Sequence, residues 1–302
     1  MNNSYQKKFQ YTEEVTNMEN LGKSLRLIRK GRNITIKQAV KDVCSQAQLS
    51  TFENGDSQIT LKRFYGIIKN LGITLEEFEY IANDYNLDNI HSLLKNIRDA
   101  YNHNNVEELK KILDIEIGKE EDGLHHELNC LMIKNLIAEL TLDFNLSSDE
   151  KQKITNYLGS IDYWGWYELN LYNNTMRSFD PKIIVNLSEE ALKRSNYYKD
   201  VPRNKKLIGQ TLLNTMIILI GYNEIKMAKK FIALTTGQLA QEDIFEKTIL
   251  LFISGAIAYY DGKIDIGKKK MKNSINIFNV VGSRALADAY KISYNNIINN
   301  QT

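Results

Sequence analysis

The chain has few of the residues that cross-link a protein or break its helices. Among 302 residues there are only two prolines, Pro181 and Pro202, and two cysteines, Cys44 and Cys130. Two isolated cysteines supply neither a disulfide framework nor a metal cluster, so the composition is typical of a reducing compartment. Because prolines are rare while Leu, Ile, Lys and Glu abound, we predict an all-α protein.

A long uninterrupted apolar run is also missing. The longest charge-free apolar stretch, residues 207–223, is close to the roughly 18 residues that a membrane-spanning helix needs. Four polar residues interrupt it, namely Gln210, Thr211, Asn214 and Thr215. The first residues carry no apolar core of the kind found in export signals. These patterns predict a cytoplasmic protein without a membrane partner.

No residue pattern typical of an enzyme stands out. The sequence offers no Ser/His/Asp arrangement, no phosphate-binding loop and no paired carboxylates at a telling spacing. The four histidines, His91, His103, His125 and His126, have no metal-ligand spacing with a cysteine or a carboxylate cluster. We therefore expect no enzyme, no cofactor and no metal site, and we interpret the histidines as surface or turn residues.

Charge is distributed unevenly along the chain. Between Met18 and Asn70 there are 10 Lys or Arg residues against 4 Asp or Glu, whereas the remainder from Leu71 onward has 27 against 31. A basic N-terminal part followed by a slightly acidic part favours a head that binds a polyanion and a body that binds something else.

Two short helices are predicted within the basic part, between Thr35 and Gly55. Two hydroxyl residues, each followed by a glutamine three positions later, have the spacing of a capping box: Thr35 with Gln38, and Ser45 with Gln48. With a bend near Val43 and Cys44 between them, the pair is typical of a helix-turn-helix, whose second helix enters the DNA major groove. We expect this recognition helix from Ser45 to about Asn54, with Leu49 and Phe52 buried.

The predicted DNA contacts fall into two sets. Small or amide-bearing side chains on the recognition helix suit base edges, and they are Gln46, Ala47, Gln48, Ser50 and Thr51. Residues expected to reach phosphates are Arg26, Arg29, Lys30, Lys37 and Asn54. An amphipathic first helix, from Glu19 to about Arg32, would place Leu21, Leu25 and Ile28 inward.

Two more helices complete the predicted head, residues 18–82. They run from Thr60 to Leu71 and from Thr74 to Ala82, with Gly72 between them and a third capping box at Thr74 and Glu77. Residues 1–17 receive no role. They are compatible with a flexible arm, a start assigned too early, or an expression remnant.

The pattern of residues 83–302 predicts a series of helix hairpins. Candidate turns near residues 104–105, 146–147, 179–180, 221 and 262 lie about 33 to 42 residues apart. The last unit, Ile244–Val281, carries small and aromatic residues at the positions typical of a tetratricopeptide repeat, and we expect Ile266, Met271 and Ile275 to face inward. Five such hairpins would stack into a right-handed arc with a concave wall, closed by a helix over Ser283–Ile298.

Polar and aromatic residues in the body suggest a binding site. Side-chain amides on successive inner helices can hold an extended peptide backbone, and an arginine suits a carboxylate, which singles out Asn174, Arg177, Gln210 and Asn214. The alternative, hydrogen bonds between helices that set the repeat geometry, stays open.

The aromatic block at residues 163–167 is either core or a ligand cage, with Trp164 and Tyr167 on one helical face. Cys44 is either a buried small residue or a redox sensor.

The order of these segments resembles a known family. The head carries LGKSLRLIRKGRNITIKQAV and SQAQLSTFENGDSQI, and the body carries YWGWYELNLYNNTMR, NKKLIGQTLLNTMIILI and FEKTILLFISGAIAYYDGK. Together they resemble the Rgg/GadR/MutR regulators of low-GC Gram-positive bacteria, over nearly the whole chain from Met18 to Ile298.

The resemblance implies a homodimeric transcription factor for double-stranded DNA, with RNA polymerase as a further candidate partner and a short signalling peptide, as in quorum sensing, on the concave face. Ser45, Gln48, Ser50, Glu53 and Gly55 match the family's recognition-helix pattern, and Arg26, Arg29 and Lys30 match its basic first helix. In the body, Asn174 and Arg177 match an Asn and an Arg that follow the aromatic block in the family, and Asn214 matches an Asn in the family's next unit. Gln46 and Thr51 replace the Lys or Arg of many relatives, which leaves the target sequence open.

Two other functions remain compatible with the sequence alone. One is a constitutive or metabolite-gated regulator, and the other is a protein-interaction scaffold that uses the repeat groove. Salt-dependent binding to duplex DNA would separate a regulator from a scaffold.

Overall fold

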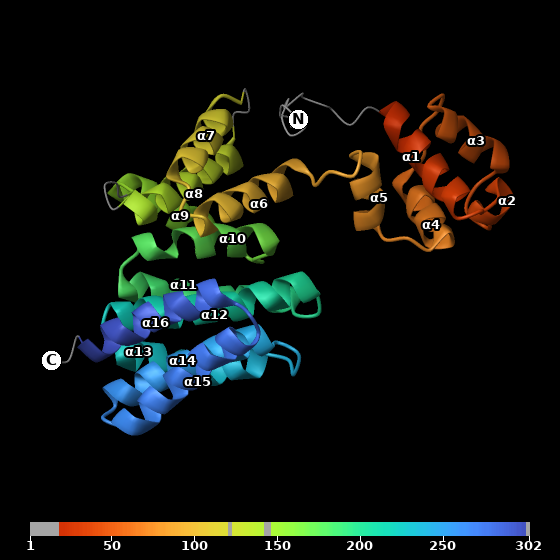
Figure 1. Cartoon of the computed structure of the whole chain (residues 1–302). Coiled ribbons are helices and arrows are strands. Elements are labelled where there is room, and N and C mark those ends of the chain that lie inside the picture. The colour runs from red at the N-terminus through yellow and green to blue at the C-terminus, as the bar shows by residue number, and fades with distance from the viewer. Residues whose placement is uncertain (1–17, 120–122, 142–145, 300–302) are drawn as a thin grey trace, which may run out of the picture. The chain divides into compact units, whose positions relative to one another are not determined.

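The computed structural model describes residues 18–119, 123–141 and 146–299, and the regular elements within these residues are all helical (Figure 1). The all-α prediction is therefore confirmed. Residues 1–17 and the start of the turn before Leu146 lie outside the described residues. Within the described part, no helix is long and apolar enough to cross a membrane.

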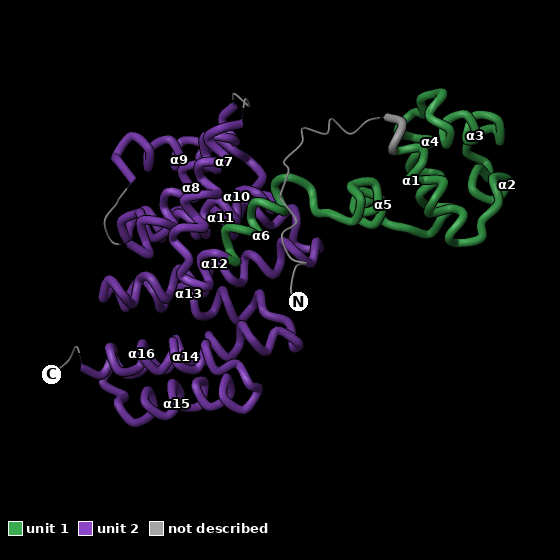
Figure 2. Tube along the Cα trace, turned by 45° about the horizontal axis from the view of Figure 1, so that its top comes forward, with its two compact units in different colours: residues 1–99 green, residues 100–302 purple. Residues whose placement is uncertain are grey.

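The chain divides into two compact units, residues 1–99 and residues 100–302 (Figure 2). The division falls inside helix α6 (Asn89–Asn102), beyond the boundary at residue 82 that the sequence suggested.

Five short helices form the head. They are α1 (Met18–Gly31), α2 (Ile36–Ala39), α3 (Gln46–Asn54), α4 (Leu61–Leu71) and α5 (Leu75–Ala82). One apolar core joins all five, and it contains the predicted inward residues Leu25 and Ile28 of α1 and Leu49 and Phe52 of α3. The five-helix head with its helix-turn-helix is confirmed.

Caps define where these helices begin and end. Complete capping boxes are present at Thr35 and Thr74, while Ser45 Oγ accepts a hydrogen bond from the Gln48 amide at 3.2 Å without the reciprocal glutamine bond. Gly55 and Gly72 end α3 and α4 in the left-handed conformation that favours glycine.

The body is a series of antiparallel hairpins. Helix α7 (Val106–Ile117) packs against α8, and the pairs are α8 (Leu124–Thr141) with α9 (Ser148–Ser160), α10 (Trp166–Thr175) with α11 (Pro181–Arg194), α12 (Pro202–Gly221) with α13 (Ile225–Gln238), and α14 (Ile244–Tyr260) with α15 (Ile264–Val280). A last helix, α16 (Arg284–Asn299), follows. Each predicted turn lies at or next to a break between consecutive helices. Helices α8, α10, α12 and α14 pack on one another in that order, so they form one layer of the stack.

The last hairpin packs through glycines. A Cβ atom on Gly267 would lie 2.7 Å from the Gly255 carbonyl oxygen and 2.7 Å from the Tyr259 nitrogen, so the backbones of α14 and α15 touch at this point. Met271 is fully buried, but Ile266 is 53% exposed, and the prediction that it faces inward is wrong. The reason is helical register, because Gly267 rather than Ile266 occupies the crossing point.

Candidate functional site

Helix α3 presents most of its predicted base-contact residues to solvent. Gln46, Ala47 and Thr51 are exposed and Gln48 and Ser50 are half-buried, while Leu49 and Phe52 lie in the core. Thr51 Oγ1 donates within its own helix and accepts a hydrogen bond from Ser57 Oγ at 3.0 Å. Because the hydroxyl hydrogen of Thr51 is already donated within α3, a DNA base would contact mainly the methyl group of Thr51.

Arg29 is a correction to the predicted phosphate set. Its guanidinium is buried between α1 and α3, where Nε contacts Glu53 Oε1 at 2.6 Å and Nη2 contacts Glu53 Oε2 at 2.7 Å. Its Nη1 donates to the Ile34 carbonyl oxygen at 2.9 Å. The hydrogen bond to Glu53 raises the pKa of Arg29. Arg29 is thus a structural ion pair, and Glu53, which matches the family pattern, is its buried partner.

The other four members of the phosphate set are on the surface. Arg26, Lys30, Lys37 and Asn54 are all exposed. Arg26 Nη1 donates to Asn54 Oδ1 at 2.8 Å, so the amide nitrogen of Asn54 points its hydrogens elsewhere and can donate to a phosphate.

A cavity of about 740 Å³ lies in the C-terminal half of the body. Its apolar wall comes from α12, α14 and α16, and includes Ile217, Phe252, Ile253, Tyr260 and Tyr290. Its polar lining is Arg177, Asn223, Ser293 and Asn296. Apolar walls combined with polar groups, one of them a cation, are typical of a ligand site.

Arg177 is the one residue of the predicted peptide set that lines this cavity. Gln210 and Asn214 lie on the same face of α12 as Ile217 and Gly221, which do line it, because these positions are spaced by three or four residues. Arg177, Gln210 and Asn214 therefore lie on or next to one surface, and the structure adds the cavity at its end.

Two amide groups of the predicted set also make contacts between helices. Asn214 Nδ2 donates to Asn173 Oδ1 at 3.2 Å, and Asn174 Nδ2 lies 3.3 Å from Met132 Sδ. These contacts support the alternative in which the asparagines set the repeat geometry. Within the described residues no hydrogen bond uses the side-chain oxygen of Asn174 or Asn214, which leaves both acceptors for a ligand.

Arg177 forms an ion pair with a largely buried carboxylate, that of Glu139. Glu139 Oε2 lies 3.3 Å from Arg177 Nε and accepts a hydrogen bond from the Tyr101 hydroxyl at 2.8 Å, while Asn135 Nδ2 donates to Glu139 Oε1 at 2.8 Å. Burial raises the pKa of Glu139, and burial together with the nearby Glu139 charge raises the pKa of Tyr101 to about 12.

The aromatic block is buried at Trp164, exposed at Tyr163 and half-buried at residues 165–167. Helix α10 begins only at Trp166, so Trp164 and Tyr167 do not share a helical face, and that prediction is wrong. Trp164 is fully buried and its Nε1 donates to the Leu158 carbonyl oxygen at 3.1 Å, which fits the core interpretation. Tyr163 is exposed and its ring packs edge-on against Tyr197.

The cysteines and histidines form no reactive cluster. Burial raises the pKa of the half-buried Cys44 thiol, and a protonated thiol is a weak nucleophile, which favours the packing interpretation. His91 Nδ1 contacts Asp88 at 2.6 Å, and His125 contacts the Tyr157 hydroxyl at 3.2 Å. Within residues 18–119, 123–141 and 146–299 no group of three potential ligands could hold a metal ion.

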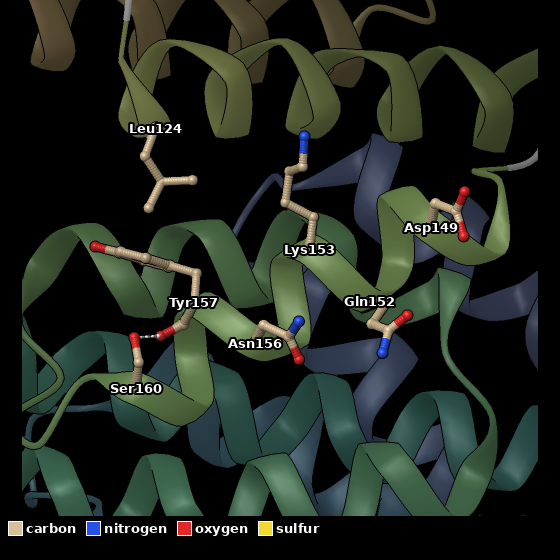
Figure 3. A pocket seen from close by; sticks show the side chains of 7 residues that line it. All are labelled: Leu124, Asp149, Gln152, Lys153, Asn156, Tyr157 and Ser160. Atoms are coloured by element: carbon tan, nitrogen blue, oxygen red, sulfur yellow. Dashed lines mark hydrogen bonds between the residues drawn. The ribbon is translucent and has the colours of Figure 1, made fainter.

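A second, more open depression of about 500 Å³ lies on α9 (Figure 3). Apart from Leu124 of α8, its lining residues all come from this one helix, among them Asp149, Lys153 and Tyr157. A site formed by a single helix cannot enclose a ligand from several sides, so we place the candidate ligand site in the larger cavity.

Sequence reasoning did not pair the residues that support these sites. Glu139 and Tyr101 are 38 positions apart, and Glu53 and Arg29 are 24 apart, so no local pattern joins them. For Arg29 one signal was available, since it falls on the same helical face as Leu25 and Ile28.

Comparisons with known proteins agree with this architecture. Residues 109–292 match the family model of the C-terminal domain of the HTH-type transcriptional regulator Rgg, and residues 25–78 match a helix-turn-helix model. The SHP pheromone receptor Rgg2 of Streptococcus dysgalactiae is 29% identical, with a TM-score of 0.77 over 91% of this chain and 98% of that chain.

Two more distant structures share the fold. A Listeria monocytogenes EGD-e protein described as a transcriptional regulator has 21% identity and a TM-score of 0.82, over 94% of this chain and 99% of that chain. PrgX in its complex with cCF10 has 13% identity and a TM-score of 0.67, over 92% of this chain and 99% of that chain.

Proposed function

Because the chain belongs to the Rgg family of HTH-type transcriptional regulators, we propose that it recognises its operator through α3 and is controlled by a short peptide in the body cavity. As a member of a family of DNA-binding regulators, it is neither an enzyme nor a pure interaction scaffold. The observation that carries the peptide assignment is the cavity itself, where apolar walls meet the cation Arg177.

For DNA, we propose that Gln46, Ala47, Gln48, Ser50 and Thr51 face bases while Arg26, Lys30, Lys37 and Asn54 reach phosphates. The exposed surface of α3 and the four exposed residues around it support this division. Base contacts discriminate among sequences, whereas phosphate contacts act on any duplex.

Gel-shift titrations on the upstream region of the gene would test the division. Gln48→Ala should cost roughly 1–3 kcal/mol on the cognate site and leave random DNA unaffected, whereas Lys30→Ala should weaken both and reduce the salt dependence by about one charge. Lys182→Ala, an exposed lysine on α11, is the matched control and should change neither. Identical behaviour of the Gln48 and Lys30 variants on specific and random DNA would reject the assignment.

For the peptide, we propose that backbone amides donate to the oxygens of Asn174 and Asn214, with Gln210 on the same face, while a carboxylate meets Arg177. The relative Rgg2 is a pheromone receptor, and PrgX forms a complex with cCF10. Apolar peptide side chains would fill the cavity between α12, α14 and α16.

Fluorescence anisotropy with a library of labelled octapeptides rich in Ile, Leu, Val and Phe would test the site. Asn174→Ala combined with Asn214→Ala should abolish peptide binding while circular dichroism and the melting temperature stay close to the parent values. Retained affinity in the double variant would remove these asparagines from the site. Ala substitution of Asn156, which lies in the depression on α9, is the control.

We further propose a homodimer that acts in the cytoplasm on two DNA half-sites, about 34 Å apart or a multiple of it. The last hairpin and α16 expose large apolar residues that a second copy would cover, including Ile266, Val280, Val281 and Ile292. In this proposal residues 18–82 are the DNA-binding domain, residues 83–302 sense the peptide and dimerise, and RNA polymerase is the partner at the promoter.

A further inference from the structure

The guanidinium of Arg177 and the hydroxyl of Tyr101 in α6 both contact the same carboxylate oxygen of Glu139. Arg177, which lines the cavity, lies 3.3 Å from Glu139 Oε2, and the Tyr101 hydroxyl donates to that same atom at 2.8 Å. Tyr101 belongs to the last turn of α6, the helix in which the chain passes from the first unit to the second.

The geometry leaves Arg177 able to bind a second anion. Its side chain is 52% exposed, and within the described residues neither of its Nη atoms makes a hydrogen bond. Glu139, by contrast, is only 16% exposed. The buried carboxylate therefore contacts the guanidinium at Nε, while the half-exposed Arg177 side chain also lines the cavity.

We propose that Glu139 is a positioning residue that orients Arg177 for an anionic ligand group and, by sharing Oε2 with Tyr101, couples occupancy of the cavity to the last turn of α6. The part that concerns the ligand rests on the proposed peptide function, whereas the coupling between Arg177 and α6 can be measured without any ligand.

The coupling follows from the charge on a buried carboxylate. Glu139 is stabilised as an anion by Arg177, Tyr101 and Asn135 against the cost of its burial. A ligand carboxylate that engages Arg177 competes for the guanidinium and weakens its contact with Oε2. The neutral form of Glu139 then becomes more favourable, and a neutral acceptor binds the Tyr101 hydroxyl less strongly than a charged one. The end of α6 is thereby held less firmly when the cavity is occupied.

Asn135 extends the same network toward the proposed peptide site. Its Nδ2 donates both to Glu139 Oε1 and to the Asn174 carbonyl oxygen, each at 2.8 Å. One carboxylate thus contacts, directly or through Asn135, the residues proposed to bind both the end and the backbone of a peptide.

Hydrogen exchange of the full-length protein, followed by mass spectrometry of peptides from residues 89–102, tests the coupling. Tyr101→Phe removes the hydrogen bond to a charged acceptor and should raise the opening of the last turn of α6 by roughly tenfold. Arg177→Ala should raise it severalfold in the parent chain, but less than twofold once Tyr101 is Phe. Glu139→Gln should resemble Tyr101→Phe and should also make the Arg177 substitution silent.

Either of two results with the network variants would overturn the coupling, as would a third with the control described below. One is unchanged α6 exchange in Arg177→Ala, and the other is an equal effect of that substitution with and without the Tyr101 hydroxyl. Tyr157→Phe is the matched control, because Tyr157 also donates to a glutamate, Glu168, at 2.8 Å, but outside this network. The effect of Arg177→Ala on α6 must survive in the Tyr157→Phe background, and its loss there would also contradict the proposal.

The ligand part has a separate test with the tightest-binding octapeptide of the library, synthesised with a free C-terminal carboxylate or as the C-terminal amide. The acid should bind at least tenfold more tightly to the parent chain, and Glu139→Gln should shrink this ratio more than it changes binding of the amide. Equal binding of acid and amide would reject the positioning role. If no library member binds, the proposed peptide function fails, and the exchange result still decides the coupling.

Discussion

The ion pair between Arg29 and Glu53 should determine whether the head is folded at all. Its two short contacts and the bond from Arg29 Nη1 to Ile34 use all three guanidinium nitrogens inside the core between α1 and α3. The two side chains are only 9% and 2% exposed, so truncating either one leaves an uncompensated buried charge.

The expected cost is large for a small domain. Removing one partner of a buried pair typically costs 3–5 kcal/mol, and whole domains are stable by only about 5–15 kcal/mol. Arg29→Ala and Glu53→Ala should therefore each bring the head close to its unfolding midpoint at 25 °C. The double variant Arg29→Met with Glu53→Leu, which replaces the pair with apolar groups of similar volume, should recover most of the loss.

The assay can separate head from body. Both tryptophans, Trp164 and Trp166, are in the body, so tryptophan fluorescence in urea follows the second unit while hydrogen exchange of peptides from residues 21–55 follows the first. We expect lost protection in the head of each single variant with an unchanged fluorescence transition. A loss below about 1 kcal/mol would refute the reasoning. If Arg29→Ala instead weakened DNA binding and lowered its salt dependence while the head kept its full protection from hydrogen exchange, Arg29 would be a phosphate contact after all.

Three further predictions concern packing and pH. Gly22→Ala should destabilise the head by at least about 1–3 kcal/mol, since its Cβ would lie 1.9 Å from the Phe52 carbonyl oxygen; parent-like exchange protection would contradict this. Gly267→Ala should lower the melting temperature of the body, because the backbones of α14 and α15 must separate, and an unchanged value would show that the hairpin can shift. Burial raises the pKa of Glu139, so its contribution to stability is present below its ordinary pKa of 4.5 and is lost as pH rises through the raised folded value. Glu139→Gln should flatten that pH dependence in urea titrations between pH 4 and 7, and an unaltered slope would contradict the shift.

Local chemistry made much of the fold predictable. Cap residues such as Thr35, Ser45 and Thr74 fix helix starts within a few positions, and hairpin turns such as that at Gly262 interrupt apolar runs. The amphipathic pattern of α3 likewise located its buried side at Leu49 and Phe52.

What could not be predicted depends on partners far away in the chain. From sequence alone, a basic residue near a recognition helix is interpreted as a phosphate contact. Only the structure shows that a carboxylate far away in the sequence lies beside it, as Glu53 does beside Arg29. The inward position in α15 is set by the close approach of Gly267 to Gly255, so Ile266 points outward. Trp164 lies before α10 because the chain turns there and its ring is buried beneath Leu158 and Tyr172, which no helical periodicity could show.

The central claim is that the head recognises a specific duplex through α3. The most direct measurement is an anisotropy titration of the full-length protein against the upstream region of its own gene and against random DNA of equal length, at several salt concentrations, with the parent chain and with Gln48→Ala. We predict a clear preference of the parent chain for the upstream region, a steep loss of both affinities with salt, and loss of the preference alone in Gln48→Ala. Equal affinity of the parent chain for both duplexes at every salt concentration would contradict the account.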